Sequence, residues 1–151
     1  MDPQLTLGSE VRKLVETRIE RTLKGVEDTL RRILESQEIS LEDLKEDIQS
    51  LEKSFNLLSQ KWNLEILYTL FLKNTINFSG MKKILGVNSR TLSDKLKSLK
   101  RYGYIKRTVE TGPPLRVKYA LTTIGKNTVL LALPLLYYSS SVAGVQAASQ
   151  T

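Results

Sequence analysis

The sequence predicts a mainly α-helical protein with one small β-hairpin. Apolar residues recur every three or four positions through most of the chain, which is the spacing of one helix face. No proline interrupts residues 9–112, so helices can run long there. Two short segments, 104–110 and 116–121, alternate apolar and charged residues instead, which is typical of strands. The diproline segment between them predicts a hairpin with a long, stiff tip.

Residues 9–59 are predicted to form a long helical, coiled-coil-like extension. Ser9 can cap its first helix, and a break at residues 37–40 separates a second helix in which Ser40 and Asp43 form a variant of the capping box. Apolar residues step by three and four, as in a coiled-coil seam. They are Ile19, Leu23, Val26, Leu30, Ile33, Leu41, Leu44, Ile48, Leu51, Phe55 and Leu58.

This seam needs a partner, because a lone helix cannot cover a narrow apolar stripe by itself. We expect the seam residues to mediate dimerisation. Two alternatives are a helical hairpin zipped within one chain and packing of both helices on the rest of the protein.

Residues 60–126 are predicted to form three helices and the hairpin. The first helix opens at Lys61-Trp62 and is strongly apolar, and the second runs from Ser79 to Leu85 before Gly86 turns the chain. Asn88 or Ser89 caps the third helix, which Gly103 closes. Three helices with a tight turn before the third, then a two-stranded hairpin, is the order of a winged helix-turn-helix. In that fold the third helix enters the major groove of DNA.

The charge is distributed unevenly along the chain. Residues 61–126 carry fourteen Lys or Arg against three acids, a net charge of +11, whereas residues 1–60 carry nine against thirteen, or −4. A clustered basic segment indicates a surface that binds a polyanion. We therefore interpret residues 60–126 as a DNA-binding domain and the heptad extension as a dimerisation device.

Candidate DNA contacts fall on three elements. The third helix offers donors, acceptors and cations for base edges and phosphates, with Arg90 as the expected bidentate contact to guanine; its set is Asn88, Ser89, Arg90, Thr91, Ser93, Asp94, Lys95 and Lys97. The second helix offers a phosphate clamp of Ser79, Lys82 and Lys83. The hairpin, or wing, offers Lys106, Arg107, Arg116 and Lys118, with Arg116 expected at the backbone or minor groove. The wing charges could instead only protect an edge strand from aggregation.

Residues 127–138 are predicted to form a C-terminal dimerisation helix that contributes Leu130 and Leu133, while residues 1–8 and 139–151 are expected to be flexible. Residues 127–151 carry no charge, but Pro134, the serines and Gly144 break the apolar run. A membrane span is therefore not expected. The amino end lacks the features of a signal peptide, which predicts a cytoplasmic, nucleoid-associated protein.

The composition excludes several kinds of chemistry. The chain has no Cys and no His, which rules out thiol redox sensing, disulfides and zinc held by those side chains. Three acids in the basic segment leave little for carboxylate catalysis. We expect no enzymatic activity, metal or cofactor, and no residue identifies an effector ligand.

The basic domain resembles the HxlR-type regulators within the wider MarR-like winged-helix family. The resemblance spans about Lys61 to Tyr138, and its landmarks are Lys61-Trp62, Asn77-Phe78-Ser79, residues 87–93 with Leu96 and Leu99, Gly103-Tyr104-Ile105, and residues 113–122 through Gly125. It implies a dimeric, DNA-binding transcription regulator whose terminal helices make the dimer. The chain departs from the family in lacking an amino-terminal cysteine, in having Gly80 where an acid is common, in the extra wing residue Leu115 and in its heptad extension.

The leading hypothesis is thus a homodimeric winged-helix regulator of transcription that binds double-stranded DNA. An architectural protein that coats DNA with little sequence preference is the second, and a protein-interaction scaffold the third. A regulator should prefer its own site by roughly a thousandfold or more, which separates it from an architectural protein.

Overall fold

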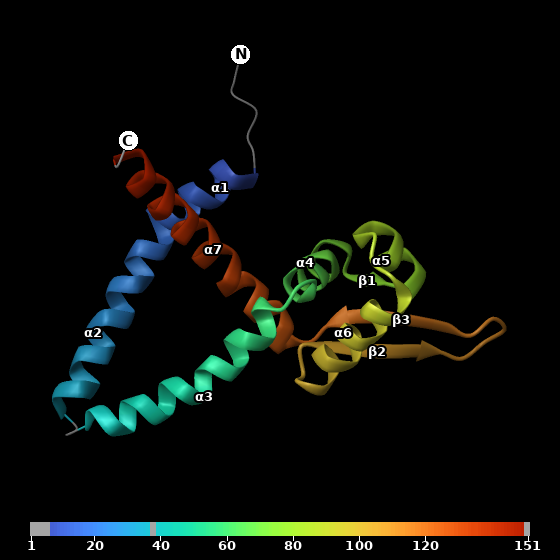
Figure 1. Cartoon of the computed structure of the whole chain (residues 1–151), viewed down its shortest axis with the longest axis horizontal. Helices are drawn as coiled ribbons and strands as arrows, with labels where there is room; N and C mark the ends of the chain where they lie inside the picture. The colour runs from blue at the N-terminus through green and yellow to red at the C-terminus, as the bar shows by residue number, and fades with distance from the viewer. Residues whose placement is uncertain (1–6, 37–38, 150–151) are drawn as a thin grey trace, which may run out of the picture. The chain divides into compact units, whose positions relative to one another are not determined.

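The computed structural model describes residues 7–36 and 39–149 (Figure 1). The chain divides into two compact units. One comprises Gln49–Val129, and the other comprises the chain on either side of it. The Gln49–Val129 unit begins inside one helix and ends inside another, so its limits differ from the predicted domain of residues 60–126.

The amino-terminal helices are α1 (Leu7–Leu14), a π-helical turn η1 (Val15–Ile19), α2 (Glu20–Ser36) and α3 (Leu41–Ser59). The predicted start at Ser9 is wrong, because the helix already begins at Leu7; the expectation for residues 1–6 lies outside the described residues. The predicted cap of α3 is confirmed. The Ser40 backbone N–H donates to Asp43 Oδ2 at 3.3 Å, and the Asp43 N–H donates to Ser40 Oγ at 3.1 Å.

The Gln49–Val129 unit confirms the predicted winged helix-turn-helix. Its helices are α4 (Asn63–Lys73), α5 (Phe78–Leu85) and α6 (Ser89–Arg101), and its wing is formed by β2 (Ile105–Glu110) and β3 (Arg116–Leu121). The sequence predicted only the two strands of the hairpin, but the sheet has three. A third strand, β1 (Thr75–Ile76), pairs with β3, so the antiparallel sheet has the order β1-β3-β2.

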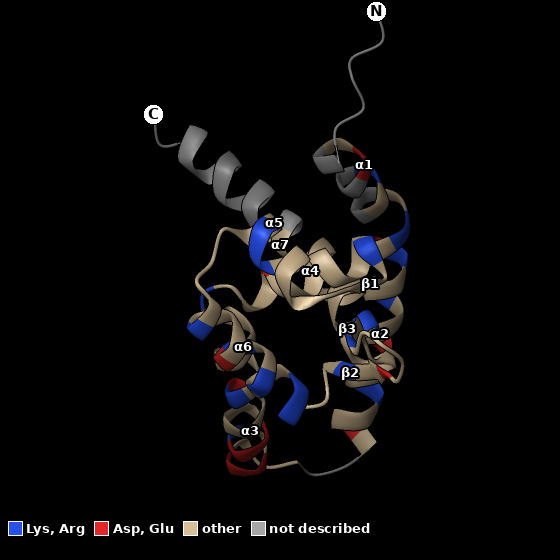
Figure 2. Cartoon of the chain, turned by 90° about the vertical axis from the view of Figure 1, so that its right-hand side faces the viewer, with Lys and Arg blue, Asp and Glu red and all other residues tan. Residues whose placement is uncertain are grey.

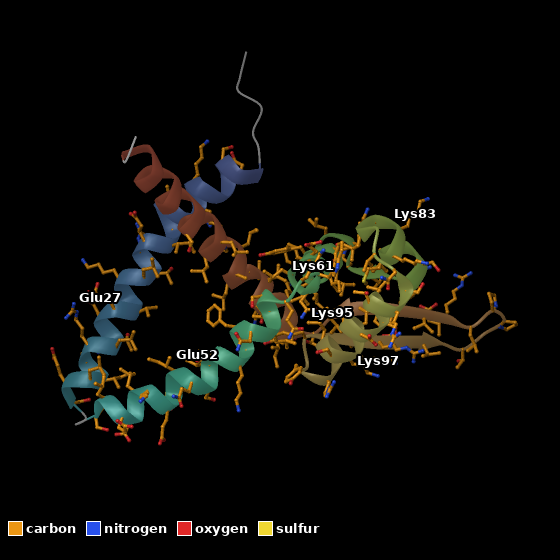
Figure 3. The ribbon with its side chains drawn as sticks, viewed as in Figure 1. Glu27, Glu52, Lys61, Lys83, Lys95 and Lys97 are labelled. Carbon is orange, nitrogen blue, oxygen red and sulfur yellow. The ribbon has the colours of Figure 1, made fainter. Side chains whose placement is uncertain are left out.

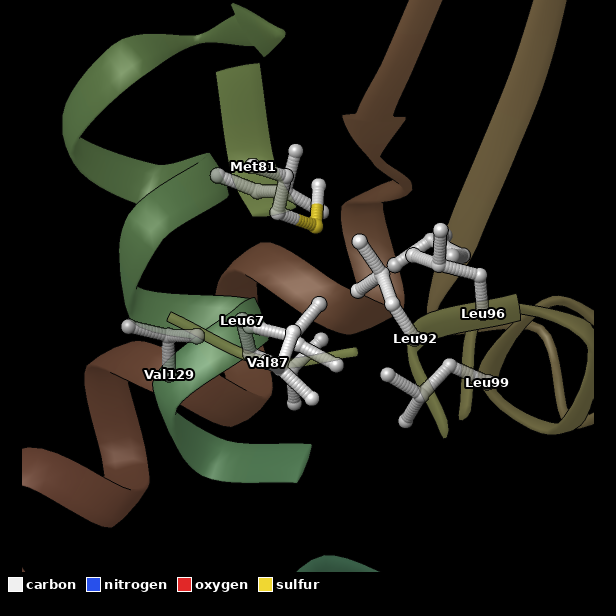
Figure 4. Close-up of a cluster of buried hydrophobic side chains, with 10 residues drawn as sticks. Leu67, Met81, Val87, Leu92, Leu96, Leu99 and Val129 are labelled. Carbon is white, nitrogen blue, oxygen red and sulfur yellow. The ribbon is translucent and has the colours of Figure 1, made fainter. Parts of the chain in front are cut away.

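The core of this unit lies where α4, α5 and α6 meet the sheet and the start of α7 (Thr123–Ser149) (Figure 4). Its fully buried residues include Ile66, Leu67, Leu70, Met81, Leu92, Leu99 and Val129. Leu58, predicted in the dimerisation seam, instead packs half-buried against this core, and Leu57 beside it is buried. The last turn of α3 therefore packs against the core of the Gln49–Val129 unit.

The joint between α3 and α4 explains why the last turn of α3 packs against the core. Trp62 adopts a left-handed conformation with φ 79°, so α4 begins at Asn63 and not at the predicted Lys61-Trp62. Such a conformation costs a bulky residue about 1–2 kcal/mol. Asn63 is fully buried, and its Nδ2 donates to the carbonyl oxygen of Leu57 at 2.7 Å, which holds the two helices at the joint.

The carboxyl-terminal helix is longer than predicted. α7 continues to Ser149 through Pro134, where the sequence predicted a tail from residue 139. Within residues 7–36 and 39–149, no helix is both long and apolar enough to cross a bilayer.

Candidate nucleic-acid interface

The amino terminus of α6 is fixed by its cap. Asn88 Oδ1 accepts a hydrogen bond from the Thr91 backbone N–H at 2.8 Å, which confirms one of the two predicted caps. This bond occupies an oxygen that was expected to face DNA. The Nδ2 group of Asn88 and the side chains of Ser89 and Arg90 remain exposed at the start of the helix.

One face of α6 is buried and the opposite face is open. Leu92, Leu96 and Leu99 are at most 2% exposed and anchor the helix to the core. The helical period of 3.6 residues places a row of exposed side chains on the opposite face. This row is Arg90, Asp94, Lys97 and Arg101, and we call it the α6 row. It gives the helix an outer surface with three cations and one acceptor.

Arg101 was not among the sequence candidates. Its guanidinium carbon lies 6.0 Å from the centre of the Tyr102 ring, a cation–π distance. The sequence signal existed, because Arg101 continues the spacing of Arg90, Asp94 and Lys97 by one more turn. The predicted set ends at Lys97.

The flanks of the α6 row are less open. Thr91, Ser93 and Lys95 are half-buried, since they lie between the exposed α6 row and the core. Lys95 Nζ also donates to Gln60 Oε1 at 3.1 Å, which ties α6 to the turn after α3. The side chains of Lys95 and Lys97 leave α6 in different directions (Figure 3). Lys97 is thus the more available cation.

The second element of the site is α5. Asn77 Oδ1 accepts from the Gly80 N–H at 2.7 Å, so α5 starts at Phe78, one residue before the predicted Ser79. The predicted phosphate clamp is brought together in a shallow, open hollow lined by Ser79, Lys82, Lys83, Gly86 and Val87. Basic residues on α5 and α6 contrast with the acids on α3 (Figure 2).

The third element is the wing, and its strand register sorts the four predicted cations. β2 and β3 pair with Lys106 opposite Ala120, Thr108 opposite Lys118 and Glu110 opposite Arg116. Side chains alternate between faces along a strand, so Lys106, Lys118 and Arg116 share one face. Arg107 lies on the other face, opposite Tyr119. The wing cations therefore do not form one patch.

One wing cation already has a partner. Lys118 Nζ lies 3.3 Å from Glu110 Oε1, and the two side chains are 39% and 52% exposed. The pairing of Glu110 with Lys118 could not be predicted from the sequence, because it depends on the hairpin register. Arg116, the expected minor-groove contact, is exposed where the wing tip rejoins β3.

The predicted seam is open for most of its length. Its members on α2 and α3, from Leu23 to Ile33 and from Leu41 to Phe55, are 41–81% exposed. Ile19, at the end of η1, is half-buried. On α7, Leu130 is exposed and Leu133 is half-buried. In the described part of the chain there is no cluster of three acids that could hold a metal ion.

The family model described as HxlR-like helix-turn-helix matches residues 57–141, more than half of the chain. The chain belongs to the HxlR-like helix-turn-helix family. The match begins in the last turn of α3. The heptad extension up to residue 56 therefore lies outside the part that this HxlR-like protein shares with its family.

Two relatives from Bacillus subtilis (strain 168) agree with this assignment. The uncharacterized HTH-type transcriptional regulator YvaP is 37% identical over 76 residues, which cover 50% of this chain and 69% of YvaP. The uncharacterized HTH-type transcriptional regulator YdzF is 31% identical over 77 residues, covering 50% of this chain and 71% of YdzF.

Solved structures show the same fold. A protein assigned to the MarR family of transcriptional regulators from Enterococcus faecalis V583 matches with a TM-score of 0.60 and 25% identity, covering 66% of this chain and 90% of that one. The reduced form of the transcriptional regulator YodB from B. subtilis matches with a TM-score of 0.56 and 23% identity over 60% of this chain and 88% of YodB. The HxlR-like domain thus has a MarR-like winged-helix fold.

Proposed function

We propose that this protein is a homodimeric transcription regulator that binds double-stranded DNA, with α6 in the major groove and the wing on the backbone or minor groove. The proposal is supported by membership of the HxlR-like family and by relatives that are named transcriptional regulators. It places the protein on chromosomal DNA in the cytoplasm.

The observation that carries the proposal is the α6 row. Its side chains point away from the core, on a helix whose start is fixed by a cap. They can therefore enter a groove without breaking any contact with the core. Arg90, in the first turn, is placed for a bidentate bond to guanine O6 and N7. Lys97 and Arg101, about two and three turns further on, suit phosphates.

The basic elements on either side of α6 would hold the duplex. Lys82 and Lys83 border the hollow on α5, and Lys106 and Arg116 lie on one face of the wing. Such contacts release counterions, so the affinity should fall steeply as salt rises. Two recognition helices related by a two-fold axis would read half-sites roughly 34 Å apart.

The test begins with DNA selected by the protein from a random duplex pool. We expect the selected sequence to bind at least roughly a thousandfold more tightly than unrelated duplexes. Arg90→Ala should cost about 1–3 kcal/mol and relax the preference at one base pair. Lys73→Ala removes an exposed cation from the end of α4 and serves as the control.

Fluorescence anisotropy at fixed salt measures the affinity of each protein for the selected duplex and for unrelated duplexes. Absence of DNA binding at low salt would refute the proposal as a whole. Equal affinity for all duplexes, unaffected by Arg90→Ala, would support the architectural alternative instead.

A further inference from the structure

The seam of α3 is an exposed apolar stripe on the part of the helix that lies before the family match. Leu44, Ile48, Leu51 and Phe55 are 41–62% exposed, and they occupy alternating a and d positions of two heptads. Contiguous apolar surface of this kind marks an interaction site. The charged residues that flank the stripe indicate what covers it.

Three pairings of this stripe can be compared by the charges at its borders. In a parallel, in-register pair of α3 helices, each Asp47 at a g position would face the partner's Glu52 at an e position. The two-fold axis would repeat this repulsion. The charges thus oppose a parallel pair.

Pairing α3 with α2 is also poorly matched. An antiparallel alignment of the two seams would bring Glu20 beside Glu52 and Glu27 beside Lys45. Glu27 already has a partner, since its Oε1 accepts from Arg31 Nη2 at 2.9 Å and Nε at 3.2 Å. This pairing would add one repulsion and compete with an existing ion pair.

An antiparallel pair of α3 helices from two copies brings together one attractive and one neutral set of flanking residues. Aligning Leu44 with the partner's Phe55 also aligns Ile48 with the partner's Leu51, without a gap in the seam. Lys45 and the partner's Glu52 then border the same two layers, and the two-fold axis makes this attraction twice. Asp47 meets the partner's Ser54, which is neutral.

Both residues of the attractive pair are available. Lys45 and Glu52 are exposed, and within residues 7–36 and 39–149 the structure contains no ion pair made by either side chain. Glu52 projects from α3 (Figure 3). The charges of α3 thus fit a second α3 running in the opposite direction.

We propose that two copies of this chain associate through an antiparallel α3 pair, fixed by reciprocal Lys45–Glu52 ion pairs. This rests on the proposed homodimer and specifies its interface. The rise of 1.5 Å per residue separates the two Ser59 residues, where α3 leads into the DNA-binding units, by about 28 Å along the pair. A parallel pair would bring these ends within about 10 Å.

The test is a charge swap in the full-length chain. Lys45→Glu and Glu52→Lys each replace two attractions with two repulsions, and we expect each to weaken the dimer roughly thirtyfold at low salt. The double variant K45E/E52K should restore the dimer to about the wild-type affinity. The controls are Lys53→Glu and Glu46→Lys, which change the same charges at f positions on the outer side of α3 and should have no effect.

Sedimentation velocity over a range of concentrations measures the dimer, and circular dichroism checks that each variant keeps its helices. A double variant that stays as weak as the single ones would overturn the antiparallel pair. So would a dimer insensitive to every swap, which would leave the homodimeric regulator intact. A wild-type chain that is monomeric throughout would overturn both, whereas the DNA titration tests the recognition helix separately.

Crosslinking gives a second reading that does not depend on affinity. The chain has no cysteine, so introduced thiols report only their own positions. Mixing a Lys45→Cys chain with a Glu52→Cys chain should yield a crosslinked dimer with a short bismaleimide, whereas Lys45→Cys alone should not. Equal yields from both samples would contradict the antiparallel arrangement.

Discussion

The ion pair in the wing leads to a prediction about DNA affinity. Glu110 holds Lys118 at 3.3 Å on the face of the hairpin that also carries Lys106 and Arg116. Both partners are substantially exposed, so the pair itself contributes about 1 kcal/mol or less to stability. Replacing Glu110 by Gln removes the acid with almost no change in shape. Lys118 is then free to bind a phosphate.

One added phosphate contact per wing steepens the dependence of log affinity on log salt by about 0.9 for each half-site. For each half-site, that corresponds to about eightfold tighter binding at 0.1 M salt and about fourfold at 0.2 M. The matched control is Glu65→Gln, which removes an exposed acid from α4. Adding Lys118→Gln to Glu110→Gln should cancel the gain.

Anisotropy titrations of the selected duplex at four or five salt concentrations give the slope directly. The reasoning is refuted if Glu110→Gln leaves both affinity and slope unchanged, or if Glu65→Gln produces the same gain. The second result would mean that net charge alone, and not the position of Lys118, controls the affinity.

Substitutions at Gly125 and Asn88 test two local features that stabilise the Gln49–Val129 unit. Gly125→Ala would drive a Cβ into the backbone oxygen of Tyr104, and we expect a loss of about 1–3 kcal/mol; the melting temperature should fall by roughly 4–8 °C per kcal/mol. Gly112→Ala, whose added Cβ would have no neighbour within 4 Å, is the control, and equal melting temperatures would contradict the clash. Asn88→Ala should destabilise the unit by about 1 kcal/mol through loss of the α6 cap, whereas Asn88→Asp keeps the cap and should lower only the affinity for DNA. Thermal denaturation beside DNA titration measures both effects, and an Asn88→Ala protein as stable as the wild type would show that the cap is dispensable.

Features set by neighbouring residues could be predicted from the sequence. The caps at Ser40 and Asn88 and the break before α3 involve partners three residues away, so the local pattern identifies them. The fold class followed from the same kind of information, together with the order of helices and hairpin. The cations of α5, together with Arg90 and Lys97 of the α6 row, were also identified, because helix period alone separates them from the buried leucines.

Features that depend on distant residues were missed. β1 has only two residues and exists because β3 lies beside it, so no local pattern marks it. The partner of Lys95 comes from the turn after α3, and the partner of Lys118 comes from the other strand of the hairpin. Leu58 fits the heptad as well as any seam residue, but the left-handed Trp62 turns the end of α3 onto the core. Periodicity could not distinguish these two fates.

The pairing of β1 also has a consequence for the order of folding. Thr75 and Ile76 pair with Ala120 and Tyr119, whereas β2 and β3 are joined by a short tip. Closing the longer loop costs more entropy, so the hairpin should form before β1 joins it. During synthesis, α4, α5 and α6 can leave the ribosome well before the sheet is complete. The proposed DNA-contacting surface of α5, α6 and the wing would then be complete only after the last residues of β3 emerge.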